Sequence, residues 1–304
     1  MRQYIYKASE CGLTDWPSGT LRLSGIDVTE DPNAADVFVC PGTIRLFEKR
    51  SGVLDIEKLN RLPYFKGNES RHAFFDVSDN FTMPIHLPIL FIRCDARGWM
   101  MQHDVNTIQM AWPVEDLGQC VDLPEGEFKY DIGFHGWVSS LVRRTSMESC
   151  LKTEGLKTDI EGHKDFYGYL KDSDPEQHRR RGNFLRSLKE SRLQLCGESI
   201  EGVFPYRFWE TLSAGRVPLL IGSDFVFPFA DEIDYDRFTV KCPRIEAPAA
   251  GQIALDFARG RTDQEILDMG KLARAAWVKF CNSSDWPKLH AYAIQKKLGV
   301  LQPA

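Results

Sequence analysis

The sequence predicts an α/β protein made of two domains, on three observations. Its 304 residues are enough for two domains of about 150 residues each. The stretch Pro205–Phe229 contains a helix pattern over 206–214, between a proline and a glycine, and then a short apolar run over 217–221. A polar turn, Gly222-Ser223-Asp224, follows that run. It would lie at the carboxyl end of a buried strand, where open α/β sheets bind their ligands.

Composition and charge are those of an ordinary globular chain. Hydrophobic residues make up 43% and charged residues 27%, and the net charge is −5 with a pI of about 5.9. There is no basic excess to favour nucleic acid or an anionic membrane as a partner. The N-terminus contains no apolar run typical of a signal peptide, and no window approaches the ~18 apolar residues of a membrane span. We therefore expect no membrane span and a cytoplasmic location.

The eight cysteines are scattered, and the absence of a C-x-x-C pair disfavours a zinc site. Cys40 and Cys196 lie in apolar runs, where a free cysteine acts as a small hydrophobe. We interpret the cysteines as reduced thiols of a cytosolic protein. Three N-x-[ST] triplets, at Asn68, Asn80 and Asn282, are typical of the alternative, secretion, although such triplets also arise by chance.

The helix expected over 206–214 carries a pair of opposite charges. Arg207 and Glu210 are three residues apart and share a face. An arginine near a helix N-terminus suits a diphosphate, because it adds a full charge to the partial charge of the free amides. A glutamate one turn later can accept hydrogen bonds from two adjacent sugar hydroxyls. The pair would suit a nucleotide-sugar, but the spacing by itself is more typical of an ordinary surface ion pair.

Several blocks of this region resemble the exostosin family of glycosyltransferases. The blocks are Ser191–Cys196, Tyr206–Leu212, Gly215–Ile221 and Pro228-Phe229, and the resemblance covers roughly residues 130–240. It implies a GT-B architecture, with two Rossmann-like domains and a cleft between them, and inverting transfer from a nucleotide-sugar. Where the family has Pro-Arg-Gly after the cysteine, this chain has Gly197-Glu198-Ser199. This departure puts phosphate binding by that loop in question.

The N-terminal half contains several strand patterns and the candidate general bases. We expect strands over 35–42, 72–77, 87–92 and 106–110, and a helix over 44–62. An inverting transferase needs a base for the acceptor proton, and a carboxylate at a strand end could supply it. Asp79 is our first candidate, Asp76 the second and Asp95 a weaker one. The alternative is that these residues only form turns.

The second domain is expected to open with a strand that ends in a Gly-x-x-Gly turn, at Gly133 and Gly136. Glycines allow the backbone to approach a phosphate closely. Arg143, in the helix that follows, matches the spacing of a similar family block and is a pyrophosphate candidate. His135 would either contact the donor phosphate or be an ordinary turn histidine.

The remaining candidates complete the expected site. Tyr206 and Ser199 join the donor-binding residues, which are Gly136, His135, Arg143, Arg207, Glu210, Tyr206 and Ser199. Asp234-Tyr235-Asp236 has the D-x-D form that holds a divalent cation in the other large glycosyltransferase fold. Because D-x-D also arises by chance, we expect no metal and no cofactor beyond the nucleotide-sugar.

The sequence thus predicts a GT-B α/β enzyme. Residues 1–125 form an acceptor-binding domain, residues 126–275 bind the nucleotide-sugar, and a helix within 276–304 crosses back to the first domain. The expected reaction is metal-independent, inverting transfer from a UDP-sugar to an oligosaccharide or a glycoprotein glycan. The alternatives are a non-catalytic member that binds a nucleotide-sugar or glycan, a metal-dependent transferase that uses the D-x-D, and, for location, a piece of a Golgi-lumenal protein.

Overall fold

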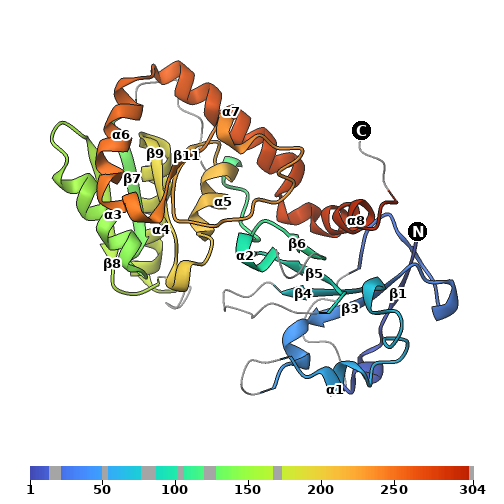
Figure 1. Ribbon diagram of the computed structural model, residues 1–304. Coiled ribbons are helices and arrows are strands. Elements are labelled where there is room, and N and C mark those ends of the chain that lie inside the picture. Colours follow the sequence, from blue (N-terminus) through green and yellow to red (C-terminus); the bar gives the residue numbers. More distant parts are fainter. Residues whose placement is uncertain are drawn as a thin grey trace. The chain divides into compact units, whose positions relative to one another are not determined.

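The computed structural model describes residues 1–13, 22–49, 54–76, 87–101, 106–119, 128–166 and 173–300 (Figure 1). The chain divides into two compact units. Unit 1 comprises Met1–Trp112, Asp224–Pro228 and Ser283–Ala304, and unit 2 comprises Pro113–Ser223 and Phe229–Asn282.

Unit 1 is built on a six-stranded parallel sheet with the order β2-β1-β3-β4-β5-β6. Its strands are β1 (Arg2–Ile5), β2 (Asp27–Val28), β3 (Val37–Thr43), β4 (His72–Asp76), β5 (Leu90–Arg93) and β6 (Thr107–Gln109). Every residue of β4 and β5 is buried, as expected for central strands of a parallel sheet whose two faces are covered. The strands predicted over 35–42, 72–77, 87–92 and 106–110 are confirmed within a few residues at their ends.

The helices of unit 1 are α1 (Ile56–Leu59), α2 (Gly98–Met101) and α8 (Trp286–Lys297). The helix predicted over 44–62 is wrong as a single element. A 3₁₀ turn over Ile44–Phe47 and α1 stand in its place, and a β-bridge between Glu48 and Leu54 separates them. The Asp55 side chain caps α1 by accepting from the Lys58 amide, so a new helix begins there.

Unit 2 has a five-stranded parallel sheet with the order β11-β10-β9-β7-β8. Its strands are β7 (Tyr130–Trp137), β8 (Thr158–His163), β9 (Ser191–Gly197), β10 (Val217–Ile221) and β11 (Val240–Cys242). The chain passes from β7 to β8 on one side and then returns to β9 on the other side of β7. The junction between the paired strands β7 and β9 is therefore the topological switch point, and doubly wound sheets bind ligands beside the carboxyl ends of the strands at such a point.

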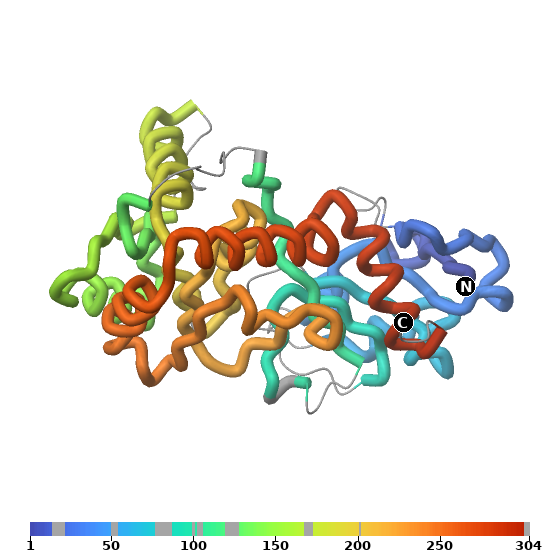
Figure 2. The backbone as a smooth tube through the Cα atoms, turned by 90° about the horizontal axis from the view of Figure 1, so that it is seen from above, coloured from blue at the N-terminus to red at the C-terminus, as the bar shows by residue number. Residues whose placement is uncertain are grey.

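The helices of unit 2 are α3 (Leu141–Lys152), α4 (Pro175–Glu190), α5 (Tyr206–Ser213), α6 (Ala250–Arg259) and α7 (Asp263–Phe280). Helices α3 and α6 pack together and share an apolar core with β7, β9 and β10. Helix α4 lies against β7 and β9, and α5 packs on α7, which is orange-red in Figure 2. A capping box begins α7, where the Glu265 carboxylate accepts from the Thr262 amide and the Thr262 hydroxyl oxygen accepts from the Glu265 amide.

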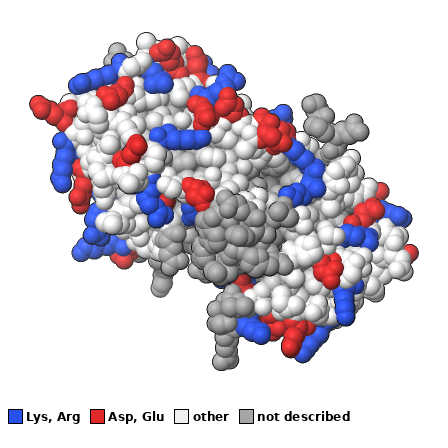
Figure 3. Space-filling model, viewed as in Figure 1, with Lys and Arg blue, Asp and Glu red and all other residues white. Residues whose placement is uncertain are grey.

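Two parallel sheets with covering helices confirm the predicted α/β class with two Rossmann-like domains. The last helix, α8, belongs to unit 1, where the ring of His290 lies 5.3 Å from that of Phe75. Within the described residues, no helix has the length and apolarity needed to cross a membrane. On the face seen in Figure 3, basic and acidic side chains are interspersed. The cysteines among the described residues are free and buried.

Candidate functional site

A cavity of about 550 Å³ opens in unit 2 at the carboxyl ends of β7 and β9, and so at the switch point of the sheet. This volume lies within the usual range of small-molecule sites. The segments after β7, β9 and β11 and the first turns of α3 form its wall. The lining residues are Ser139, Ser140, Leu141, Val142, Thr145, Glu198, Ser199, Ile200, Gly202, Arg244, Ile245, Ala247 and Pro248.

Serine side chains join the beginning of α3 to the end of β9. Ser140 is the N-cap of α3: its hydroxyl oxygen accepts from the Arg143 amide at 3.2 Å and its hydroxyl donates to the Glu198 carbonyl at 2.7 Å. The hydroxyls of Ser139 and Ser199 lie 3.2 Å apart. The N-terminus of α3, with its partial positive charge, therefore faces the cavity between polar side chains, an arrangement that suits an anion such as a diphosphate.

Glu198 is the most deeply buried charged residue of the cavity wall, with only 3% of its surface exposed. Its backbone amide donates to the Ile221 carbonyl at 2.8 Å, which fixes the residue at the end of β9. One carboxylate oxygen, Oε1, lies 2.8 Å from Nη2 of Arg244. The other, Oε2, is buried and has no hydrogen-bond partner within the described residues. An unmet buried acceptor of this kind is costly, and a ligand can satisfy it.

The cavity also has an apolar part. Leu141, Ile200 and Ile245 are among the large hydrophobic side chains that the described residues leave exposed, and Ile245 is 87% exposed. All three line the cavity. Exposed apolar side chains beside polar groups are typical of binding sites, and they would suit the face of a planar ring.

Arg143 lies beneath the switch point and is buried. Its guanidinium donates from Nε to the Gly197 carbonyl and from Nη1 to the Trp137 carbonyl, both at 2.9 Å. Burial, with the charge of Arg207 as a second cause, lowers the pKa of Arg143 to about 10. Arg143 thus holds the ends of β7 and β9 together, and it does not line the cavity.

Arg207 and Glu210 form the ion pair that the sequence offered as the alternative, although the pair is buried. Nη1 of Arg207 lies 2.9 Å from Oε2 of Glu210, and Nη1 of Arg181 lies 2.9 Å from Oε1. Arg207 also donates to the His135 carbonyl at 2.8 Å and places its guanidinium 3.5 Å from the ring centre of Phe184. Both carboxylate oxygens of Glu210 are therefore engaged with arginines, and donor contacts by this pair stay a prediction.

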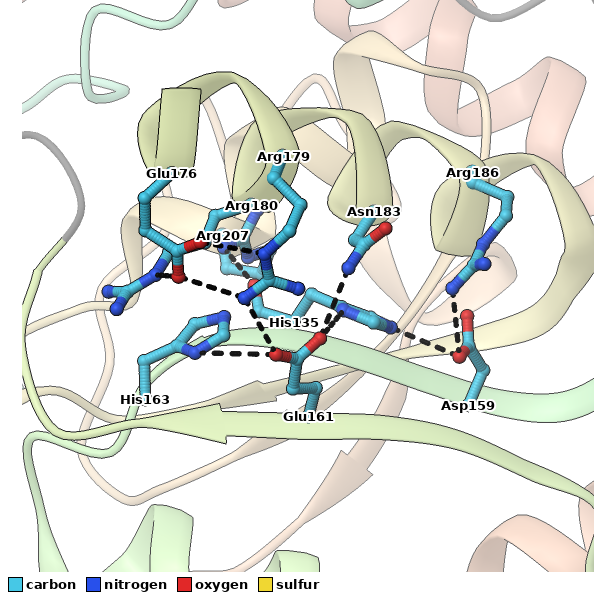
Figure 4. A network of polar contacts seen from close by, with 10 residues as sticks. All are labelled: His135, Asp159, Glu161, His163, Glu176, Arg179, Arg180, Asn183, Arg186 and Arg207. Atoms are coloured by element: carbon cyan, nitrogen blue, oxygen red, sulfur yellow. Dashed lines mark hydrogen bonds and ion pairs between the residues drawn. The ribbon is translucent and has the colours of Figure 1, made fainter. Parts of the chain in front are cut away.

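His135 lies in a polar network between β8 and α4 (Figure 4). Its Nε2 is 3.1 Å from Oδ1 of Asp159, and its Nδ1 is 3.3 Å from Oε2 of Glu161. Glu161 also contacts His163 and Arg179. Although burial raises the pKa of Glu161, these neighbours hold it below its ordinary value. His135 is not among the cavity's lining residues.

Of the other predicted donor-binding residues, Ser199 alone lines the cavity. A Cβ at Gly136 would lie 3.1 Å from Nη2 of Arg207, so the glycine gives that guanidinium room. The Tyr206 hydroxyl donates to the Pro113 carbonyl at 2.6 Å.

The candidate bases belong to unit 1. Asp79, the first candidate, lies outside the described residues. Asp76 ends β4, is 1% exposed and lies 3.7 Å from Nε of Arg45. Asp95 is buried beside Arg97, at 3.6 Å.

The D-x-D residues lie in unit 2, before β11. Asp236 pairs with Lys241, and Asp234 precedes a 3₁₀ turn. Across the described ranges, no group of three or more His, Cys, Asp or Glu side chains is placed to hold a metal ion.

Sequence reasoning missed Glu198, Arg244 and Ser140 as members of a site. Glu198 directly follows β9, Arg244 lies two residues after β11, and Ser140 is the N-cap of α3. Strand ends and helix N-caps are signals that the sequence contained. Glu198 was noted only as a departure from the family pattern.

The comparisons with known proteins are distant. No protein-family model matches the chain. Over 79 residues, 26% of the chain, the sequence is 29% identical to a probable glycosyltransferase of Arabidopsis thaliana, and the match spans 17% of that relative. The chain is thus similar to a glycosyltransferase over one short segment. The match does not establish the exostosin family.

Solved structures give a likeness of the same kind. TarM matches with a TM-score of 0.41 and 8% identity, over 80% of this chain and 60% of TarM. A mutant of T4 phage BGT in complex with UDP-glucose matches with a TM-score of 0.36 and 14% identity, over 97% of this chain and 99% of BGT. A likeness this distant does not transfer a function.

Proposed function

We propose that the protein is a glycosyltransferase that takes a sugar from a UDP-sugar and transfers it to a hydroxyl of an oligosaccharide or glycoprotein glycan. The cavity at the switch point of unit 2 carries this proposal. Its helix N-terminus and serine hydroxyls suit a diphosphate, and its apolar part suits a base. The exostosin-like blocks and the short match to a probable plant glycosyltransferase favour the same activity.

The proposed reaction inverts the anomeric carbon. The acceptor oxygen forms a bond to that carbon from the side opposite the diphosphate, while the bond from the carbon to the diphosphate oxygen breaks. The electron pair of the broken bond leaves with UDP, and the acceptor proton passes to a carboxylate base. We assign the base to Asp79, with Asp76 as the second candidate. Because amide dipoles stabilise the departing diphosphate, the proposal requires no metal.

A melting-temperature screen tests the binding part of the proposal. The full chain is heated with UDP, GDP, CMP and their common sugar conjugates, with and without EDTA. A ligand that binds only the folded state raises the midpoint. We expect a rise with UDP and UDP-sugars that persists in EDTA. If no nucleotide raises the midpoint, the proposal is overturned.

Product formation separates the enzyme from its rival, a non-catalytic protein that binds the nucleotide-sugar. Gly197-Glu198, at the place of the family's Pro-Arg after the cysteine, is the observation that favours the rival. Release of UDP from a UDP-sugar in the presence of glycan acceptors would support the transferase. Binding without turnover across acceptors would support the rival, and turnover that EDTA abolishes would point instead to the D-x-D.

A further inference from the structure

The unmet oxygen of Glu198 assigns this residue a role within the proposed donor site. We infer that Glu198 binds the nucleoside of the nucleotide-sugar by accepting a hydrogen bond from one of its neutral O–H or N–H groups. This inference rests on the proposed function.

The charges around the carboxylate decide what kind of partner fits. Arg244 already supplies one positive charge at Oε1, so the pair is neutral overall. A second cation at Oε2 would lack further ligands, since no metal-holding cluster exists in the described residues. A phosphate at Oε2 would be repelled. A neutral hydrogen-bond donor satisfies the oxygen without either cost.

The surroundings of Glu198 indicate which part of a ligand supplies the hydrogen-bond donor for Oε2. The diphosphate finds its amides and hydroxyls at the α3 N-terminus, beside Ser139 and Ser140. The exposed apolar side chains Leu141, Ile200 and Ile245 line the same cavity and suit a base. A nucleoside carries donors of two kinds, the ribose hydroxyls and the ring N–H of uracil, and either fits the chemistry of Oε2.

Glu210 was the residue that the sequence favoured for this contact. Arg207 and Arg181 occupy both of its oxygens at 2.9 Å, and it does not line the cavity. Glu198 lines the cavity and keeps one oxygen unmet. The nucleoside contact is therefore assigned to Glu198.

The test measures the affinity of the wild-type chain and Glu198→Gln for UDP, 2′-deoxy-UDP, 3′-deoxy-UDP and N3-methyl-UDP by calorimetry. An analogue that lacks the O–H or N–H group bound by Glu198 should bind the wild type about 10- to 100-fold more weakly than UDP does. A penalty with a deoxy analogue locates the contact at the ribose, and a penalty with the N3-methyl analogue locates it at the base. In Glu198→Gln the penalty should shrink, which shows that the two groups are coupled.

Controls distinguish this role from a structural one. Glu246→Gln, an exposed carboxylate of the same unit outside the cavity, should change neither affinity nor analogue preference. Glu198→Gln should fold with a midpoint close to that of the wild type, because the smaller desolvation cost of a neutral side chain offsets the weaker contact with Arg244. If that variant fails to fold, equal binding of UDP and all analogues by the wild type still overturns the inference.

Three outcomes overturn the inference, in two different ways. Equal binding of UDP and all analogues by the wild type, or an unchanged penalty in Glu198→Gln, would overturn the role of Glu198 and leave the proposed function standing. No binding of UDP by the wild type would overturn both.

Discussion

Two buried carboxylates of unit 2 differ in how completely the protein satisfies them. Glu210 on α5 has arginines on both oxygens, whereas Glu198 after β9 has one arginine and one unmet oxygen. Glu210 belongs to the block that resembles the exostosin family, and Glu198 is where the chain departs from that pattern. Glu210, within the motif, is fully satisfied by the fold. Glu198, where the chain departs from the motif, retains one carboxylate oxygen that a ligand could satisfy.

Removal of Glu210 should give the largest effect on stability. Glu210→Ala leaves Arg181 and Arg207 without their shared partner, and the loss of one member of a buried ion pair costs about 3 kcal/mol. Urea unfolding should show this decrease in the free energy of unfolding, with Glu246→Ala as a near-neutral control. A cost below ~1 kcal/mol would mean that the ion pairs of Glu210 do not contribute substantially to stability.

Removal of Arg244 should give the next largest effect. Arg244→Ala leaves the buried carboxylate of Glu198 without its counter-charge, which should cost about 2 kcal/mol. Glu198→Gln, added to the same chain, should restore most of that loss, because the charge is then gone. Urea unfolding of both single variants and the double variant measures the coupling. Strictly additive effects would show that the two side chains do not interact in solution.

Arg143→Met tests the support beneath the cavity. The substitution keeps an unbranched side chain but leaves the Gly197 and Trp137 carbonyls without their donor, and we expect a loss of about 1–2 kcal/mol. Thermal or urea unfolding checks the cost. If stability is unchanged while nucleotide binding is abolished, Arg143 contacts the ligand directly, as the sequence first suggested.

The smallest effect on stability should come from Glu198 itself. Glu198→Gln is expected to change the free energy of unfolding by less than about 1 kcal/mol, because removing the desolvation cost of a buried charge offsets the weaker contact with Arg244. Calorimetric melting without ligand measures it. A large destabilisation would mean that Glu198, like Glu210, stabilises the fold, and the two carboxylates would then not differ in role.

Local patterns in the sequence predicted much of the fold. The strand over 217–221 was predicted correctly, because a short apolar run is a local feature. The prediction of one helix over 44–62 was wrong, because it relied on the spacing of apolar residues and did not foresee the β-bridge between Glu48 and Leu54. Helical periodicity alone does not record where a helix stops.

The site was harder to predict, because its members meet only through the order of the strands. Glu198 and Arg244 are 46 positions apart, and the arrangement of β9 and β11 brings them to one cavity. Arg181 reaches Glu210 across 29 positions, so the sequence did not reveal that this carboxylate is fully engaged. Ser199 was the predicted donor-binding residue that came to line the cavity.

If the cavity at the ends of β7 and β9 binds the nucleotide diphosphate, as we claim, a negative charge placed at the N-terminus of α3 should weaken that binding. Leu141 is exposed, lines the cavity and begins α3, where an acidic residue favours the helix. Titration calorimetry of UDP, in EDTA and at fixed salt, would compare the wild type with Leu141→Glu and its neutral match Leu141→Gln. We predict tight binding by the wild type and Leu141→Gln, and binding at least about tenfold weaker by Leu141→Glu, since the added charge repels the diphosphate. Equal affinity of all three chains would contradict the claim and place the nucleotide elsewhere.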